Sequence, residues 1–285
     1  MNKETTSVLR YPGGKYRALK KILPFVPLEF SEFREPFVGG GSMFIALKQL
    51  FPTAKYKIGD LNPELYCFWT TLRDRPKEFI EVVAQTKKSK SDGKVLYREL
   101  AKQDMPSDSF QRAMRFFVLN RITYSGTIDS GGYSDEAFHK RFTESNIAKL
   151  EPLSHLLQGV EIVNKNYEHM LFEKGNDVFI YLDPPYWNSK KSKLYGTNGN
   201  LHRFFNHEEL AKNIEHCKHR WLMTCDDCPE MRGLFGVHNL LAREWSYGMT
   251  NVNGKRTIMG KELFVANYSL VMQADKRLIC ANAFN

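Results

Sequence analysis

Five short apolar segments, each ending at a turn and separated from the next by a helix-like pattern, constrain the fold of this 285-residue chain most strongly. They lie at residues 33–38, 56–60, 160–163, 178–183 and 221–225. Such runs are typical of buried strands, and their alternation with helices predicts an α/β fold with a largely parallel sheet. Residues 240–247 and 263–268 flank a Gly/Asn-rich loop at 248–260, which predicts an antiparallel pair at one sheet edge.

The pattern changes to helices between Pro63 and about Lys149, where no comparable apolar strand occurs. The clearest helical patterns cover 76–86 and 109–120, and a glycine-bearing stretch follows from 123 to 142. Helices that interrupt a sheet-forming sequence favour an insertion, although long crossovers would also fit. We expect a main domain of residues 1–62 and 146–285 and a mainly helical insertion at 63–145.

The chain is basic, with 41 Lys and Arg against 32 Asp and Glu and a formal charge of +9. This excess indicates a polyanionic partner but no particular sequence preference. Phosphate contact and a plain solvated face explain the basic helical region equally well. Its basic residues are Lys87, Lys88, Lys90, Lys94, Arg98, Lys102, Arg112, Arg115, Arg121, His139, Lys140 and Arg141.

Neither a secretory signal nor a membrane span is expected, because no apolar run approaches the roughly 20 residues that a span requires. The five cysteines do not resemble a secreted disulfide framework, so we expect a cytoplasmic protein with free thiols. One Cys/His cluster lacks the second paired spacing of a zinc site, and we expect no metal there. Its members are His216, Cys217, His219, Cys225 and Cys228.

The glycine-rich segment Glu35-Pro36-Phe37-Val38-Gly39-Gly40-Gly41-Ser42 lies between a predicted strand and an apolar helix at 43–50. Glycines at the carboxyl end of a sheet allow a nucleotide-like ligand to approach the backbone. Asp60 ends the next strand, where an acidic group can bond to ribose hydroxyls. The segment predicts an adenosine-type cofactor, and a tight structural turn is the alternative for the glycines alone.

The expected cofactor is S-adenosyl-L-methionine. A dinucleotide fingerprint would require glycine in place of Phe44. The carboxylate of Glu35 would repel a pyrophosphate but would pair with the ammonium group of a methionine moiety.

The tetrapeptide Asp183-Pro184-Pro185-Tyr186 follows the predicted strand at 178–182, at the same edge of the sheet as the glycines. An exocyclic aromatic amine is a poor nucleophile, and two acceptors on its hydrogens would direct its lone pair toward an incoming methyl group. Asp183 and the Pro184 carbonyl can be those acceptors. Pro185 restricts the backbone and Tyr186 offers a stacking face for an extruded base. The alternative is a double-proline turn with an acidic cap.

Together with Tyr11-Pro12-Gly13-Gly14-Lys15 and Leu119-Asn120-Arg121, these segments make the chain resemble the Dam-type (D12 class, alpha group) DNA adenine N6-methyltransferases. The resemblance implies a Rossmann-like S-adenosylmethionine-dependent methyltransferase sheet as catalytic domain and an inserted helical DNA-recognition subdomain at 63–145. It implies methylation of adenine N6 in a base flipped out of double-stranded DNA. We expect a monomer, and a cognate restriction endonuclease is a candidate partner.

The resemblance also implies site residues. Catalysis would depend on Asp183, Pro184, Pro185 and Tyr186. Cofactor would contact Tyr11, Gly13, Gly14, Lys15, Glu35, Phe37, Gly39, Gly41, Asp60, Asn166, Tyr167 and Asp183. DNA would contact Asn120, Arg121, Tyr124, Ser125, Lys140 and Arg141. Asn120 and Arg121 would hold phosphates, and Asn166-Tyr167 replaces an acidic residue that reads the cofactor adenine in many relatives.

Some positions depart from the family. Ser125 stands where well-known relatives have a wedging asparagine, and the stretch 128–142 is shorter than in GATC-specific relatives, so GATC is not assigned. The basic loop 187–205 could close over the base or be plain surface. Asn206 and Glu209 predict a capped helix that begins at His207, which makes His207 structural.

Two other functions remain open at this point. A cytosine N4-methyltransferase would use the same geometry, but relatives acting on cytosine more often have Ser or Asn in place of Asp183. A catalytically silent DNA-binding relative would keep the basic insertion without needing the tetrapeptide.

Overall fold

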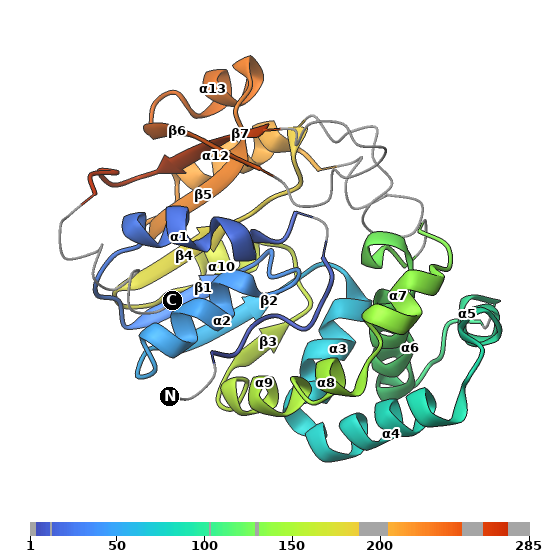
Figure 1. The fold of residues 1–285 in the computed structure, drawn as a ribbon. Helices are drawn as coiled ribbons and strands as arrows, with labels where there is room; N and C mark the ends of the chain where they lie inside the picture. The colour runs from blue at the N-terminus through green and yellow to red at the C-terminus, as the bar shows by residue number, and fades with distance from the viewer. Residues whose placement is uncertain are drawn as a thin grey trace.

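The computed structural model describes residues 4–11, 13–102, 104–128, 131–187, 205–246 and 259–272. Within them, seven strands form one sheet in the order β3-β2-β1-β4-β5-β7-β6 (Figure 1). Strands β1 to β5 are parallel, and β7 is antiparallel to both β5 and β6. This confirms the predicted α/β fold and the antiparallel pair. The strands are β1 (Glu32–Glu35), β2 (Lys55–Gly59), β3 (Glu161–Val163), β4 (Val178–Leu182), β5 (Arg220–Asp226), β6 (Asn239–Ser246) and β7 (Met259–Ala266).

The sheet reverses its strand order between β1 and β4. From β1 the chain proceeds outward to β2 and β3, and it then returns to the other side of β1 as β4. In open α/β sheets, ligands bind in the crevice beyond the carboxyl ends of the strands at such a switch point. The glycine loop leaves β1 there and the tetrapeptide leaves β4 there, so the fold brings the two predicted segments together.

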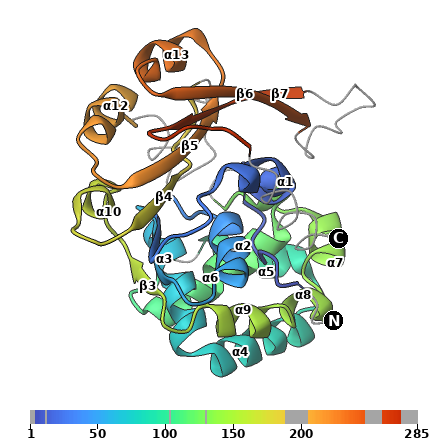
Figure 2. The ribbon, with the colours of Figure 1, turned by 90° about the vertical axis from the view of Figure 1, so that its left-hand side faces the viewer.

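Helices cover both faces of the sheet (Figure 2). In β4 the alternating side chains divide between two cores, with Phe179 and Tyr181 facing one and Ile180 and Leu182 the other. The first core includes α1 (Leu19–Ile22) and α2 (Ser42–Leu50), and the second includes α10 (Glu168–Phe172), α12 (His207–Glu215) and α13 (Pro229–Phe235). Short 3-10 helices, η1 (Lys15–Ala18) and η2 (Leu23–Phe25), flank α1.

A block of helices separates β2 from β3 and gathers near β3 (Figure 1). Its centre is the packing of two helices, α3 on α6, where the rings of Phe68 and Phe117 stack with centroids 5.7 Å apart. This matches the expected helical interruption of the sheet, and the domain boundaries at 63 and 145 stay a prediction. The elements are α3 (Pro63–Asp74), α4 (Pro76–Ser89), α5 (Gly93–Lys102), α6 (Ser109–Ile122), η3 (Tyr124–Gly126), α7 (Asp135–Lys140), α8 (Glu144–Ile147) and α9 (Leu150–Leu156).

Side-chain caps explain where several helices begin. Asn62 accepts from the Glu64 N–H at α3, and Asp108 caps α6 in the same manner. At α12, the Glu209 N–H donates to Asn206 Oδ1 at 3.0 Å, which confirms the predicted cap and the start at His207.

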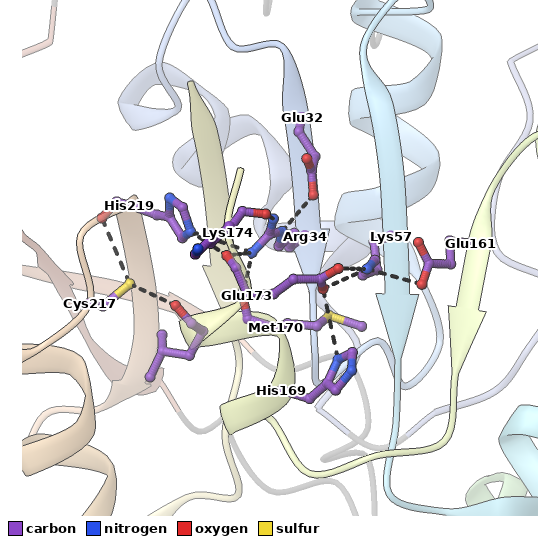
Figure 3. A network of polar contacts seen from close by, with 11 residues as sticks. Glu32, Arg34, Lys57, Glu161, His169, Met170, Glu173, Lys174, Cys217 and His219 are labelled. Atoms are coloured by element: carbon purple, nitrogen blue, oxygen red, sulfur yellow. Dashed lines mark hydrogen bonds and ion pairs between the residues drawn. The ribbon is translucent and has the colours of Figure 1, made fainter. Parts of the chain in front are cut away.

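A polar network on the α10 face of the sheet fixes that helix (Figure 3). Arg34 of β1 is 1% exposed and donates to Glu32 at 2.6 Å and to the carbonyls of Met170 and Glu173 at 2.7 Å. The last carbonyls of a helix lack partners within the helix, so the guanidinium satisfies them. Lys57 of β2 binds the Glu173 carboxylate at 2.5 Å. Strands β1 and β2 therefore hold α10 in place.

The described parts of the chain contain no group of three or more potential metal ligands, and the described cysteines are buried and free. Among the described helices, none combines the length and the apolar character that crossing a membrane requires.

Candidate active site at the carboxyl ends of β1 and β4

Asp183 lies directly after β4 and is bound by an ion pair. Lys15 Nζ lies 2.7 Å from each carboxylate oxygen and also donates to the Gly13 carbonyl at 2.9 Å. Thr224 of β5 donates to Asp183 Oδ1 at 3.2 Å and shares a 2.7 Å hydrogen bond with Tyr181. Burial raises the pKa of Asp183, while Lys15 and Thr224 lower it. The structure thus brings the predicted residues Gly13, Lys15 and Asp183 together.

Two contacts hold Tyr186, one at its hydroxyl and one over the face of its ring. Its hydroxyl donates to Glu262 of β7, with oxygens at 2.7 and 2.9 Å. Lys15 Nζ lies over the ring, 4.9 Å from its centroid. Glu262 is fully buried, and burial raises its pKa to about 8. Sequence reasoning missed Glu262; its only signal was an acidic residue directly before the apolar run Leu263-Phe264-Val265.

Backbone groups of the tetrapeptide region are also fixed. His207 Nε2 lies 2.7 Å from the Pro185 carbonyl, and the Trp187 N–H donates to Asp226 Oδ1 at 2.9 Å. Among the described residues, none donates a hydrogen bond to the Pro184 carbonyl.

Two carboxylates organise the loop after β1. The Phe44 N–H donates to Glu35 Oε2 at 2.8 Å, and burial raises the pKa of Glu35 well above its ordinary value. Asp60 accepts from the N–H groups of Gly39 at 3.1 Å and Asn62 at 2.9 Å, and burial raises its pKa to about 6. Both carboxyl groups therefore lie in surroundings that disfavour negative charge in the absence of a compensating cation.

The loop glycines accommodate the protein's own aromatic rings. Gly39 and Gly41 have φ of 44° and 71°, a backbone region that favours glycine. A Cβ at Gly39 would lie 2.7 Å from the Tyr11 ring, and one at Gly41 would lie 2.9 Å from the Trp69 ring. Gly39 is thus in close contact with Tyr11 and Gly41 with Trp69, a supporting residue that the sequence did not reveal.

An aromatic group lies beside this loop. The rings of Phe37 and Tyr167 stack at 5.5 Å with an interplanar angle of 27°, and Phe205 lies 5.7 Å from Phe37. Asn213 of α12 donates to the Tyr167 hydroxyl at 2.8 Å. Asn166 is exposed, and its Oδ1 accepts from the Tyr167 N–H at 2.7 Å. Phe37 and Tyr167, both predicted to contact the cofactor, thus lie together, whereas the side chain of Asn166 binds the neighbouring backbone.

Two predicted phosphate ligands lie inside the protein instead. Asn120 is 1% exposed and exchanges two 2.9 Å hydrogen bonds with the Arg10 backbone. Arg121 is 6% exposed and donates to the carbonyls of Val8 at 2.6 Å and Arg141 at 2.7 Å. Their donors serve the protein's own backbone, so the interpretation of these two residues as direct phosphate ligands is corrected to a structural one.

The other predicted DNA-contact residues are accessible. Tyr124 is 62% exposed and precedes Ser125, whose φ of 55° is rare for a residue other than glycine. Lys140 and Arg141 are exposed at the end of α7, where Lys140 pairs with Glu136 at 3.0 Å. The basic residues predicted in the loop after Trp187 fall outside the described residues; they are Lys190, Lys191, Lys193 and Arg203.

A glycine loop after β1 and an Asp-Pro-Pro-Tyr segment after β4 meet at the switch point of the sheet, and this combination defines the class of the protein as a Rossmann-like methyltransferase acting on an amino group. The sequence profile of the D12 class N6 adenine-specific DNA methyltransferases matches residues 11–249. The chain belongs to this family.

Named relatives agree with the family. The chain is 24% identical over 280 residues to the type II methyltransferase M1.LlaDCHI of Lactococcus lactis subsp. cremoris, covering 91% of this chain and 94% of the relative. It is 26% identical over 195 residues to a DNA adenine methylase of Vibrio cholerae, covering 65% and 66%. It is 23% identical over 269 residues to M.CviBI of Paramecium bursaria Chlorella virus NC1A, covering 92% and 99%.

Proposed function

We propose that the chain transfers a methyl group from S-adenosyl-L-methionine to N6 of an adenine flipped out of double-stranded DNA. One observation supports this most strongly: Asp183 and Pro184 directly follow β4 at the switch point, beside the loop after β1, and Lys15 binds the Asp183 carboxylate there. Two acceptors on one planar amine fix its hydrogens and direct its lone pair.

The donor set fits the proposed cofactor. Glu35 and Asp60 have raised pKa values that a nearby cation would lower, and Phe37 and Tyr167 provide aromatic surface. Glu35 would hold the ammonium group, Asp60 the ribose hydroxyls, and the two rings the adenine. When bound, S-adenosylmethionine supplies an electrophilic methyl group on a sulfonium.

The chain's own residues prepare the amine. Asp183 accepts one N6 hydrogen in the proposed complex and the Pro184 carbonyl accepts the other. Lys15 occupies both Asp183 oxygens in this structure, so the amine must share or displace that bond. Transfer would break the sulfonium–methyl bond, leave a neutral thioether and form the bond between N6 and the methyl carbon. The proton that N6 loses would pass to Asp183, whose raised pKa allows this carboxylate to hold it.

Accessible side chains of the helical block suit DNA contact. We propose that Tyr124, Ser125, Lys140 and Arg141 meet the duplex, with the exposed Tyr124 ring contacting bases and the cations contacting phosphates. We further propose that the chain acts as a cytoplasmic monomer, with a cognate restriction endonuclease as candidate partner. Sedimentation of the purified chain with and without a DNA duplex tests the monomer.

The decisive test compares Asp183→Ala with Asp74→Ala, a change at an exposed carboxylate of α3. Asp183→Ala should abolish transfer of labelled methyl groups while salt-dependent DNA binding remains within about twofold, because phosphate contacts lie elsewhere. Transfer by Asp183→Ala at the wild-type rate would refute the mechanism.

Mass spectrometry of digested product DNA separates the alternatives. The proposal requires N6-methyladenine, whereas N4-methylcytosine would identify the other amine substrate. Absence of any methylated base after incubation of the wild-type chain with genomic DNA would favour the catalytically silent relative.

A further inference from the structure

Glu262 is an ionisable residue in a fully buried strand position. It lies in β7 directly before Leu263, Phe264 and Val265, and all four are fully buried. Its register partner on β5 is Asp226, the last residue of that strand, so Glu262 lies at the same edge of the sheet as Asp183. Burial of a carboxyl group is costly unless it is hydrogen-bonded, and this position therefore requires a specific partner.

That partner is Tyr186, whose hydroxyl donates to the two Glu262 oxygens at 2.7 and 2.9 Å. Strand β5 lies between β4 and β7 in the sheet, so the contact crosses a whole strand to reach the segment after β4. Backbone pairing alone would not join these two elements. The hydrogen bond is thus a tie between the edge hairpin and the tetrapeptide.

The tie limits the orientation of an aromatic ring. Tyr186 is attached to the backbone at one end and to Glu262 at its hydroxyl, and Lys15 lies 4.9 Å from the ring centroid while bound to Asp183. We infer that Glu262 is a positioning residue that fixes the Tyr186 ring as the stacking platform for the extruded adenine. This inference rests on the proposed function, in which the base stacks on that ring while Asp183 accepts from its amine.

The charge balance of the site is compatible with this role. Burial, together with Asp183 and Asp226, raises the pKa of Glu262, whereas Lys15 and Tyr186 lower it. A carboxyl group that is neutral near pH 7 adds no second negative charge beside the Lys15–Asp183 pair. It can therefore anchor the phenol without competing for the lysine.

Two substitutions of Glu262 distinguish its hydrogen bond to Tyr186 from the space that its side chain fills. Glu262→Gln retains an acceptor of the same size and should keep kcat within about threefold. Glu262→Leu retains the size without an acceptor and should lower kcat by about tenfold to a hundredfold, with the KM for S-adenosylmethionine unchanged. With 2-aminopurine at the target position of the duplex, Glu262→Leu should raise the fluorescence of the bound complex, because a loosened ring stacks less well on the base.

A double variant that combines Glu262→Leu with Tyr186→Phe tests whether Glu262 acts on kcat through the Tyr186 hydroxyl. Phenylalanine retains the ring without the hydroxyl, so Tyr186→Phe should reproduce the loss of kcat, and Glu262→Leu should then add little to it. Glu244→Leu, at an exposed carboxylate of the neighbouring β6, is the matched control and should change neither kcat nor fluorescence. Thermal unfolding of each variant verifies that it is folded.

Three results would overturn the inference. These are wild-type kcat and fluorescence in folded Glu262→Leu, an equal loss from that change in the Tyr186→Phe background, and wild-type kcat in Tyr186→Phe if the leucine variant does not fold. Failure of the proposed function is distinguishable, because a wild-type chain that methylates no DNA would show it before any variant is compared.

Discussion

At the scale of single residues, Lys15 is the cation around which the acidic groups of the site are arranged. It lowers the pKa values of Glu35, Asp183 and Glu262, each of which burial raises. Lys15 is 4% exposed, and it binds both the Gly13 carbonyl and the Asp183 carboxylate of the candidate active site.

Replacing Lys15 by methionine should raise the pKa of Asp183 further. Since the proposed mechanism requires the Asp183 carboxylate to accept from the amine, the acidic limb of the pH–rate profile should move to higher pH. Rates on that limb should fall roughly tenfold for every pH unit by which it moves. Single-turnover rates at saturating cofactor test this, and Lys20→Met, at an exposed lysine of α1, is the control. An unmoved acidic limb would contradict the prediction.

Glu262 should also make stability depend on pH. Its pKa is about 8 in the folded chain and 4.5 ordinarily, so the folded state binds more protons between these values. The stabilisation is complete below pH 4.5 and is lost as the pH rises through 8. Relative to Glu262→Gln, the wild type should lose up to about 1.4 kcal/mol of unfolding free energy per pH unit in this window. Urea denaturation at pH 6 and pH 8 measures this difference between the wild type and Glu262→Gln. The control Glu244→Gln retains Glu262 and should lose the same unfolding free energy as the wild type.

At the scale of elements, the buried Arg34 joins β1 to α10. Arg34→Met removes the partner of Glu32 and of three backbone carbonyls around the end of α10. Breaking a buried pair of this kind costs about 3–5 kcal/mol of unfolding free energy. The matched change Arg232→Met removes the ion pair of an exposed arginine with the half-buried Asp227 and should cost no more than about 1 kcal/mol. If chemical denaturation gave Arg34→Met the same small loss of unfolding free energy that is expected of Arg232→Met, the α10 network would be unimportant for stability.

The features that could be predicted from the sequence are those that depend on residues close together along the chain. The parallel strands, the closing hairpin and the cap at Asn206 were found because apolar runs and capping residues are neighbours along the chain. Strand β1 is shorter than expected, ending at Glu35, because the backbone turns there toward Gly39 and Gly41.

Contacts between distant residues were beyond that kind of reasoning. Tyr186 and Glu262 are separated by 76 residues, and no spacing rule joins them. Asn120 was expected to hold a DNA phosphate because the family resemblance implied it, but it binds the Arg10 backbone, 110 residues away. Only the path of the N-terminal segment across α6 reveals that role.

At the scale of the whole molecule, the distribution of charge should determine how DNA affinity responds to salt. Arg141 is exposed on the helical block, whereas Lys218 is exposed at the amino end of β5, the opposite edge of the sheet from Asp183. If Arg141 contacts one phosphate, Arg141→Ala should lower the slope of log K against log salt by about 0.9, and Lys218→Ala should leave it unchanged. Fluorescence anisotropy with a labelled duplex at several salt concentrations distinguishes them. A lowered slope in Lys218→Ala and an unchanged slope in Arg141→Ala would place the DNA at the amino end of β5 instead.

The pairing of β2 with β3 has a consequence for inheritance. Lys57 lies opposite Glu161 and Gly59 opposite Val163, so the strands before and after the helical block are neighbours in the sheet. The stretch of a gene that encodes the helical block could be exchanged, shortened or extended while the codons for the strands remained unchanged. We expect selection for a new DNA site and selection for methyl transfer to act on separate stretches of such a gene, so that recognition can diverge quickly on a chemistry that is conserved.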